Sequence, residues 1–337
     1  DAGNNITMEP YRAYVSDRLD PGQRQAGFLM QSAFTGLAQM LAFLTPSLLV
    51  MLGMNADWVD PHGIPYTVRV VFWSGAALSF VTIAWSVLRV PELPLGEAER
   101  TRIAAEPKGL GAALVEIAAA IRAMPPAMRK LGVMSLFQWF GMWGYWTYVI
   151  YVVARGIYGT TDPASSGFHA AVLTNGEMAA FYNAIAFVSA FAMLPVARRI
   201  GPGPLHAVCL AAGGVAMLAI PQVTDKALLF VAVSGIGLAW GSIMGNPYAI
   251  LANSIPPERT GVYMGIFNMM IVIPMLLFGV LMARLDLGFM AIGLGFYERF
   301  LGNDPRTMLH LCGLCLLAAA LAVLAVREGR AGRNSAT

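Results

Sequence analysis

The sequence has few charged side chains for its length. Aspartate, glutamate, lysine and arginine make up 12% of the 337 residues, whereas hydrophobic residues make up 57%. Soluble domains carry about 25% charged residues. This composition excludes an ordinary soluble enzyme and indicates a polytopic membrane protein. The net charge of +3 does not by itself distinguish between classes of protein.

The sequence also lacks the motifs of nucleotide and metal chemistry. It contains no Gly-x-x-x-x-Gly-Lys-Ser/Thr loop and no His-Glu-x-x-His pair. We therefore expect no ATP-driven pump, no metalloenzyme, no cofactor and no metal site. The three cysteines all lie in apolar segments, so no disulfide framework is implied. Cys312 and Cys315 are spaced like a metal or redox pair, but they lack companions and we interpret them as packing residues.

Hydrophobic runs long enough to cross about 30 Å of hydrocarbon follow a partial, more polar opening helix. They cover residues 26–52, 68–89, 131–152, 177–197, 206–222, 228–252, 261–284 and 307–326. Clusters of proline, glycine, asparagine and aspartate separate the runs, as turns and loops require. The sequence therefore predicts an all-α membrane protein with many spans.

Arginine and lysine alternate between the loops. One set of loops and helix ends holds 16 of these residues, and the other set holds 6. Cytoplasmic loops carry the excess of positive charge in membrane proteins. We therefore predict that the richer set, which includes the C-terminus, is cytoplasmic. The chain is expected to be a multi-pass protein of the cell membrane, the inner membrane in a bacterium.

A long polar connection divides the chain. Residues 91–130 contain Glu-Ala-Glu-Arg-Thr-Arg and an alanine-rich stretch at 110–123, which predict a cytoplasmic loop with an interfacial helix. Residues 1–90 hold the end of one group of spans, residues 131–326 hold six more, and residues 327–337 form a cytoplasmic tail. This division predicts two six-helix halves, and we expect roughly the first three helices to lie upstream of Asp1.

A short internal repeat supports two related halves. Pro10-Tyr11 is followed by Pro21-x-x-Arg24 and a glycine-led apolar helix. Pro247-Tyr248 is followed by Pro256-x-x-Arg259 and a second such helix. The match is short enough to arise by chance. Related halves are the usual construction of transporters.

Polar residues share one face of the opening helix. A helix turns 100° per residue, so Asp1, Asn5, Met8 and Arg12 fall within about 60° of arc. A charge at membrane depth costs at least about 2.5–3.5 kcal/mol and points to function by default. The alternative is that Asp1 and Arg12 only pair with other helices to hold a bundle together.

The run after the polar connection is rich in aromatic residues. Trp139, Trp143 and Trp146 lie at i, i+4 and i+7 on one face, and Gln138 and Tyr145 lie on a neighbouring stripe. Aromatic faces beside a side-chain amide suit sugar rings, whose C–H faces pack on the ring while their hydroxyls form hydrogen bonds. Aromatic residues are also common at membrane interfaces, so this alternative remains open.

Other polar side chains lie inside apolar runs. Each needs a hydrogen-bonding partner in hydrocarbon, so each faces the bundle interior or a wet cavity. For any single one, a structural bond between helices is the simpler interpretation. These residues are Gln31, Gln39, Tyr182, Asn183, Asn246 and Asn268.

Charged residues also gather at the predicted cytoplasmic helix ends. Asp17, Arg18, Arg24 and Arg259 could form a gate that breaks and re-forms as two halves rock. Ordinary solvated helix ends would show the same pattern. In the run before Asn246-Pro247, Gly237, Gly241 and Gly245 predict a close helix-packing face, and the Asn-Pro pair predicts a break in that helix.

Several of these motifs resemble one family. Asp1-x-x-Asn4-Asn5, Pro10-x-Arg12-Ala13 and Asp17 resemble the fourth helix of the plant sucrose:proton symporters, and more closely their bacterial and animal relatives in the major facilitator superfamily. The resemblance covers essentially the whole chain. It extends to Leu136-Phe-Gln138-Trp139-Phe, Phe181-Tyr-Asn183, Ser242-Ile-Met-Gly245-x-Pro247-Tyr248, Gly261-Val-Tyr-Met-Gly-Ile-Phe-Asn268 and Leu301-Gly-Asn-Asp304.

The resemblance implies a twelve-helix, two-half fold that takes up a disaccharide or α-glucoside with a proton by alternating access. It implies that Asp1 is the proton site and that Arg12 contributes to sugar binding or coupling. Glu9 departs from the plant pattern and could share the coupling role. Sugar-binding candidates are Asn4, Asn5, Arg12, Gln31, Gln138, Trp139, Tyr145, Asn183 and Asn268.

Expected partners are a small sugar, a proton and the lipid bilayer, with no nucleic acid and a monomeric chain. Two alternatives remain. A sodium-coupled glycoside symporter of related fold could use the oxygen atoms of Asp1, Asn4, Asn5 and Glu9 as ion ligands. A membrane enzyme or non-transporting sensor is less favoured, because the sequence shows no nucleophile–base pair or metal set.

Overall fold

The computed structural model describes residues 2–55, 58, 60–61, 66–90, 94, 96–105, 109–256, 259–282, 285–286 and 291–326. For residues 2–7, 9, 98–99, 102–103, 110, 285–286 and 291–292 the description covers the backbone alone. Almost all of this part of the chain is helical. Residues Leu285–Asp286 (β1) and Ala291–Ile292 (β2) form a short antiparallel pair.

The first helices are α1 (Ala2–Arg18), α2 (Pro21–Met51), α3 (Tyr66–Arg89), α4 (Glu97–Ala105), α5 (Leu110–Arg122) and α6 (Pro126–Ile157). The later ones are α7 (Ser166–Ile200), α8 (Pro202–Ala219), the 3₁₀ turn Ile220–Gln222, α9 (Lys226–Ile243), α10 (Asn246–Ala252), α11 (Thr260–Met282), α12 (Phe296–Leu301) and α13 (Pro305–Leu324). Side chains start several of them: Ser165 caps α7, Asp225 caps α9 and Asp304 caps α13.

The predicted hydrophobic runs are confirmed as helices. Within the described residues, seven helical segments are long and apolar enough to cross a membrane. An eighth is counted if the neighbouring segments Gly111–Arg122 and Pro126–Ile157 are taken together as one span. The helix α6 is longer than its predicted run of 131–152, because residues on both sides of that run continue the helix.

Contacts divide the chain into two units, residues Leu41–Arg122 and the remainder. The smaller unit contains the end of α2, then α3, α4 and α5. The helix expected in the alanine-rich stretch at 110–123 is α5. These units differ from the predicted boundaries at residues 90 and 130, and the division into two transporter halves stays a prediction.

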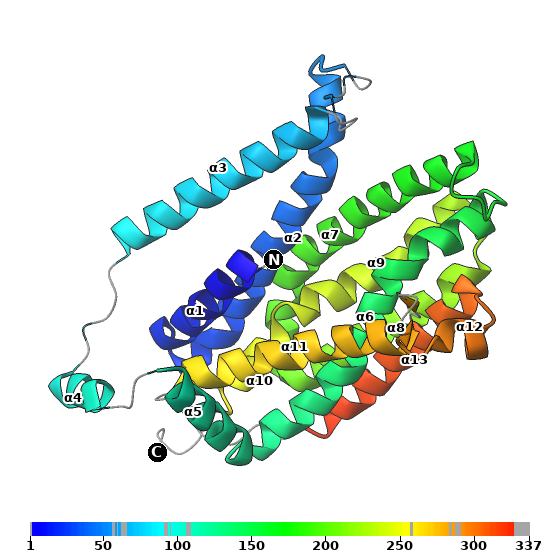
Figure 1. Cartoon of the computed structure of the whole chain (residues 1–337). Helices are drawn as coiled ribbons and strands as arrows, with labels where there is room; N and C mark the ends of the chain where they lie inside the picture. Colours follow the sequence, from blue (N-terminus) through cyan, green and yellow to red (C-terminus); the bar gives the residue numbers. More distant parts are fainter. Residues whose placement is uncertain are drawn as a thin grey trace. The chain divides into compact units, whose positions relative to one another are not determined.

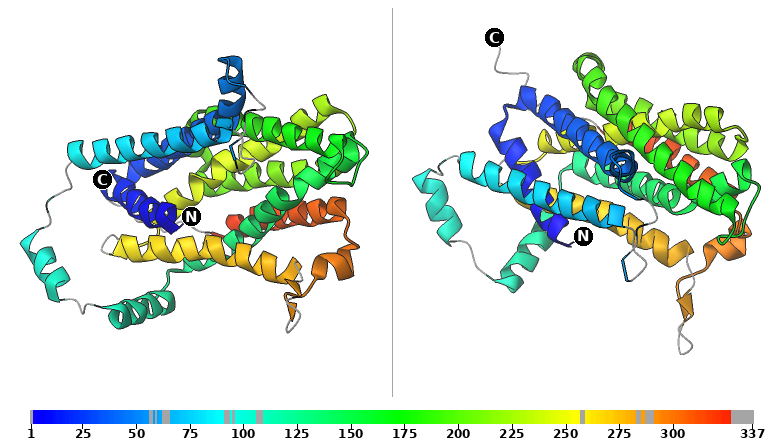
Figure 2. Two further views of the ribbon diagram at one scale, coloured as in Figure 1. Left: turned by 45° about the horizontal axis from the view of Figure 1, so that its top comes forward. Right: turned by 90° about the horizontal axis from the view of Figure 1, so that it is seen from above.

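The larger unit is a bundle of long helices (Figure 1). Helix α6 packs on α13, α13 on α8, α8 on α9, α9 on α7, and α7 returns to α6. Helix α11 lies along α6, and α1 lies against α11 (Figure 2). Because these helices are apolar on most faces, the bundle buries its polar residues and leaves apolar side chains on its outer surface.

Glycines allow the closest helix contacts. A Cβ atom on Gly237 would lie 2.7 Å from the carbonyl oxygen of Tyr182 in α7, and one on Gly241 would lie 3.0 Å from that of Ala186. A Cβ atom on Gly245 would lie 3.2 Å from the carbonyl oxygen of Phe28 in α2. The predicted close-packing face is therefore confirmed, and it brings α9 directly onto α7.

The predicted helix break is also present. Helix α9 ends at Ile243, and α10 begins at Asn246, directly before Pro247. Proline has no backbone N–H to continue the α9 hydrogen-bond ladder. The two helices together still make one apolar segment, Lys226–Ala252. The break lies between Ser242 and Asn246, which are four residues apart.

Candidate functional site

A buried arginine lies where the opening helix meets the bundle. Arg12 of α1 is only 2% exposed, and its guanidinium carbon lies 4.0 Å from the ring centroid of Tyr248 in α10. The Tyr248 ring also contacts Phe28 of α2 and Phe267 of α11, with centroid distances of 5.9 and 5.2 Å. The electron-rich ring face attracts the cation, so this contact offsets part of the cost of burying its charge.

The first part of α2 bonds to α9 at two levels, seven residues apart. The Ser32 hydroxyl donates to the Gly241 carbonyl oxygen at 2.6 Å. The Trp240 indole N–H donates to Oε1 of Gln39 at 2.7 Å. Seven residues return a helix almost to the same face. One face of α2 is therefore fixed to the helix that breaks before Asn246.

Tryptophan rings gather next to the Gln39 contact. The Trp240 ring lies edge-on to Trp139 and Trp146 of α6, with centroid distances of 6.2 and 5.3 Å. Trp139 and Trp146 contact each other at 6.3 Å. Trp143, on the same predicted stripe, is 38% exposed and contacts Trp146. The aromatic stripe of α6 thus meets a tryptophan from a second helix at the bundle interior.

A chain of hydrogen bonds joins buried polar groups of four helices, α6, α8, α9 and α10. Nε2 of His206 in α8 lies 2.9 Å from Oε1 of Gln138 in α6, and its Nδ1 lies 2.8 Å from the Ser242 hydroxyl. The Asn246 amide donates to the same hydroxyl at 2.7 Å. An amide oxygen can only accept, so Nε2 carries the proton and Ser242 donates to Nδ1. The chain therefore has one direction, from Asn246 through Ser242 and His206 to Gln138.

Some buried acceptors have no donor among the described residues. They are Oδ1 of Asn183, Oδ1 of Asn246 and Oε1 of Gln31. Leaving a buried polar group unsatisfied costs about 1–3 kcal/mol, so such atoms usually meet water or a ligand. Asn183 lies close to α2, because a Cβ atom on Gly36 would be 3.0 Å from its carbonyl oxygen.

Arg24 ties together two helix ends. Its Nε donates to the Ser16 carbonyl oxygen near the end of α1, at 3.1 Å. One terminal nitrogen donates to the Ala252 carbonyl oxygen at the end of α10, at 3.0 Å. The last carbonyls of a helix lack partners within it and carry partial negative charge, so a guanidinium suits both. The predicted gate residue thus links the two places where the short repeat occurs.

The other predicted gate residues lie on the surface, and their part in a gate stays a prediction. Arg18 is exposed and lies 5.6 Å from the ring of Tyr14 on its own helix. Asp17 and Arg259 are exposed as well. The two copies of the repeat also differ, because Tyr11 is 52% exposed whereas Tyr248 is buried against Arg12.

Other predicted site residues are placed as follows. Tyr145 is fully buried inside the bundle, and Asn268 is partly buried on α11. Asp1 lies outside the described residues. Asn4, Asn5 and Glu9 lie on the backbone of α1, and their side chains are outside the description. Arg12, Gln138 and Trp139 therefore each contact a residue of another helix. The role of Asp1 as the proton site stays a prediction.

The partners of these residues were missed by sequence reasoning. His206 and Ser242 stand alone in apolar runs, and nothing local distinguishes them from isolated core residues. Trp240 and Tyr248 belong to segments that were interpreted through glycine packing, the repeat and the family resemblance, none of which indicated their contacts. The usable signal was the pair of polar residues Ser242 and Asn246, which lie one helical turn apart around the predicted break.

The arrangement can bind and orient polar ligands. Among the residues that the structure describes, no group of three histidine, cysteine, aspartate or glutamate side chains is placed to hold a metal ion.

Comparison with curated proteins gives no match. The sequence profile of the Major Facilitator Superfamily matches residues 2–279, which is most of the chain. The chain therefore belongs to the Major Facilitator Superfamily and is a multi-pass membrane transporter.

Proposed function

We propose that the protein is a secondary active transporter that carries a neutral disaccharide or α-glucoside, of the sucrose or maltose type, together with a proton. The observation that carries this proposal is the meeting of Gln39 with Trp240 beside Trp139 and Trp146. Indole faces offer flat apolar surfaces for the C–H faces of sugar rings, and the amide offers a hydrogen bond to a hydroxyl.

The unpaired acceptors support a ligand rich in hydroxyl groups. Among the described residues, Oδ1 of Asn183 and Oε1 of Gln31 receive no hydrogen bond, and both residues flank the contact of α2 with the bundle. A sugar hydroxyl can donate to such an oxygen and accept from a neighbouring amide at the same time. Neutral amides impose no charge on the ligand, so they favour an uncharged sugar over a sugar phosphate.

Asp1, with Glu9 as a second candidate, supplies the proposed proton site. A carboxylate in a membrane cavity can take up a proton on one side and release it on the other. Arg12, predicted to share a helical face with Asp1, is buried against Tyr248. A proton and a sugar that both favour one conformation are coupled through that conformation.

Rocking of two halves is the proposed transport movement. The Arg24 bonds to Ser16 and Ala252 join two helix ends that the positive-inside pattern assigns to the cytoplasm. We assign this contact as part of a cytoplasmic gate whose bonds break and re-form during transport. The proposal includes a location in the cell membrane, the inner membrane in a bacterium, with a cytoplasmic C-terminus and a monomeric unit.

The test is sugar uptake by the full-length protein in proteoliposomes. Radiolabelled sucrose and maltose are supplied under an imposed pH gradient, with and without sodium, to the native protein and to Asp1→Asn. Uptake that follows the pH gradient and is lost in Asp1→Asn supports proton symport. Uptake that depends on sodium would mean that sodium, and not the proton, is the coupling ion. The absence of accumulation of either sugar would overturn the substrate assignment.

A further inference from the structure

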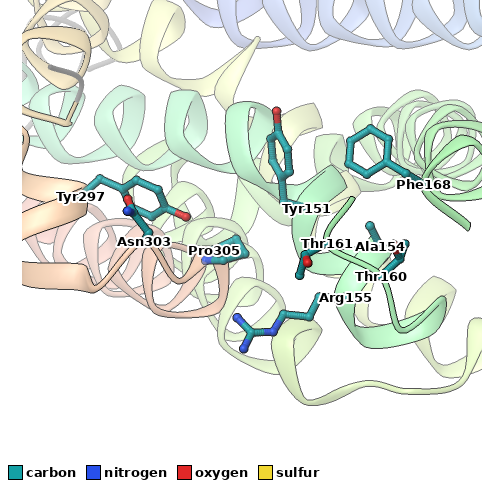
Figure 3. A pocket seen from close by; sticks show the side chains of 9 residues that line it. All are labelled: Tyr151, Ala154, Arg155, Thr160, Thr161, Phe168, Tyr297, Asn303 and Pro305. Carbon is teal, nitrogen blue, oxygen red and sulfur yellow. The ribbon is translucent and has the colours of Figure 1, made fainter. Parts of the chain in front are cut away.

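A surface cavity lies at the opposite end of the bundle from Arg24. It is bounded by the last turn of α6, the connection from α6 to α7, the first turn of α7, helix α12 and the start of α13. Its volume is about 170 Å³. Figure 3 shows Tyr297 and Asn303 on one side, Phe168 on the other, and Tyr151, Arg155 and Thr161 between them. We refer to this space as the outer cavity.

The charge of the outer cavity is balanced. The Arg155 guanidinium at the end of α6 lies 3.1 Å from the carboxylate of Asp304, which also accepts from the backbone N–H of Arg306 at 2.9 Å. This pair joins α6 to the first turn of α13. Because the arginine already faces a carboxylate, the cavity offers donors without a net positive charge. A neutral ligand is therefore favoured over an anion.

Aromatic rings provide the walls. Tyr151 contacts Phe168, with ring centroids 5.6 Å apart, and Tyr297 contacts Tyr148 at 4.6 Å. Burial, with Tyr148 and Asp304 nearby, raises the pKa of Tyr297 to about 12. Its hydroxyl therefore keeps its proton at neutral pH and can donate a hydrogen bond. Ring faces and phenolic hydroxyls together suit a ligand with both C–H and O–H surfaces.

Asn303 supplies an amide from a constrained turn. It has φ of 55°, and among the described residues it alone, apart from glycines, has a positive φ. Its backbone N–H donates to the Tyr297 carbonyl oxygen at 3.2 Å, which fixes the turn between α12 and α13. Glycine adopts this conformation at lower cost. A glycine at this position would keep the turn and remove the amide, so the two contributions can be separated.

We infer that the outer cavity is a separate subsite for one neutral pyranose ring. Sites for drug-sized ligands have volumes of about 300–1,000 Å³. The volume of about 170 Å³ therefore fits one sugar ring rather than a disaccharide. The inference rests on the proposed sugar transport, and it places an initial sugar contact away from the tryptophan cluster.

The test uses thiol protection in the full-length protein in detergent, which exposes both faces. Cys209, Cys312 and Cys315 are first replaced by alanine, and Thr161→Cys then introduces one thiol at the outer cavity. Methyl α-glucoside, a neutral single-ring sugar, is expected to slow the reaction of this thiol with a water-soluble methanethiosulfonate in a saturable way. Glucose 6-phosphate is expected to protect less well.

Two variants control the measurement. Asn303→Gly should raise the protecting concentration about three- to tenfold, the loss of one or two neutral hydrogen bonds. Ala164→Cys lies exposed in the same connection outside the cavity lining, and its labelling should not respond to the glucoside. An unchanged protecting concentration in Asn303→Gly, or equal protection at Ala164→Cys, would overturn the subsite.

Sugar uptake is measured in parallel on native protein in proteoliposomes. Uptake without protection of Thr161→Cys overturns the outer cavity and leaves the proposed function standing. Protection of the thiol together with uptake that does not depend on the pH gradient supports the sugar subsite in the outer cavity and overturns proton coupling. Absence of both protection and uptake overturns the subsite and the sugar assignment together.

Discussion

The Arg12 side chain combines a permanent charge with almost complete burial. Its guanidinium lies over the Tyr248 ring, which Phe28 and Phe267 hold in place. A cation–π contact is worth about 0.5–1 kcal/mol when exposed and about 2 kcal/mol or more when desolvated. This pair joins α1 to α10, so its energy bears on whether those two segments stay together.

A double-mutant cycle measures that energy. Arg12→Ala and Tyr248→Leu should be coupled by about 1–2 kcal/mol in the free energy of unfolding, because each variant removes the same contact. Tyr248→Phe is the matched control, since it keeps the ring and should retain most of the coupling. Unfolding in detergent gives the values, and additivity within about 0.5 kcal/mol would contradict the contact.

The His206 chain gives a second prediction at this scale. His206→Leu leaves the Gln138 amide oxygen and the Ser242 hydroxyl without their partner. Each unsatisfied buried group costs about 1–3 kcal/mol, so the variant should lose about 2–4 kcal/mol of stability. Adding Gln138→Leu removes one of the orphaned groups. In a detergent unfolding curve, the double variant should recover at least about 1 kcal/mol of the lost stability. A further loss would show that the broken hydrogen bonds of His206 are not the cause of the destabilisation.

Helix α9 depends on glycine at its contact with α7. Gly237→Ala places a Cβ atom 2.7 Å from the Tyr182 carbonyl oxygen and should destabilise the protein by about 1–3 kcal/mol through overpacking. Gly279→Ala on α11 meets nothing within 4 Å and should be neutral or slightly stabilising. Thermal unfolding of both variants checks the prediction. Equal unfolding temperatures for the two variants would mean that the close approach of α9 and α7 does not contribute to stability.

The hydrogen bonds of Arg24 to α1 and α10 are tested by the accessibility of a thiol at the end of α10. In a variant whose three cysteines are replaced by alanine, Ala252→Cys adds a thiol at a position that is only 3% exposed while keeping its backbone carbonyl. Adding Arg24→Ala should increase the rate of thiol labelling several-fold, because the end of α10 is no longer held. Arg18→Ala is the control, since its described ring contact is within α1. Equal rates in the two variants would contradict the gate.

The existence of the helices was predictable because their signals are local, whereas α6 and α7 extend beyond the predicted runs 131–152 and 177–197. Long apolar runs, the Asn246-Pro247 break and the glycines at positions 237, 241 and 245 each depend on neighbours within a few residues. The partners across the bundle were not predictable in this way. Nothing near His206 in the sequence indicates that it meets Gln138 and Ser242, because those contacts join three helices.

The candidate site shows the same limit. Sequence pattern singled out Arg12 as a charge in the polar opening helix, and Gln138 and Trp139 as polar and aromatic residues in an apolar run. It assigned Gln138 to sugar binding, whereas the structure turns its amide oxygen toward His206. Its role in sugar binding therefore stays a prediction. A side chain's environment depends on helix order around the bundle, which periodicity within one helix does not encode.

At the scale of the whole molecule, family membership fixes a transporter, while the coupling ion and the sugar are the proposed parts of the account. The buried groups that suit a sugar lie on α2, α6, α7 and α9. The groups that suit a proton lie on the opening helix, at Asp1 and Glu9. Coupling requires that both sets respond to one conformational change.

Proton movement driven by sugar tests this claim most directly. The full-length protein is placed in lightly buffered proteoliposomes, and the external pH is recorded when sucrose or maltose is added without any imposed gradient. The account predicts that the native protein makes the external solution more alkaline as protons enter with the sugar, and that Asp1→Asn does not. Sugar entry with no pH change, or an equal change in Asp1→Asn, would contradict proton symport through Asp1.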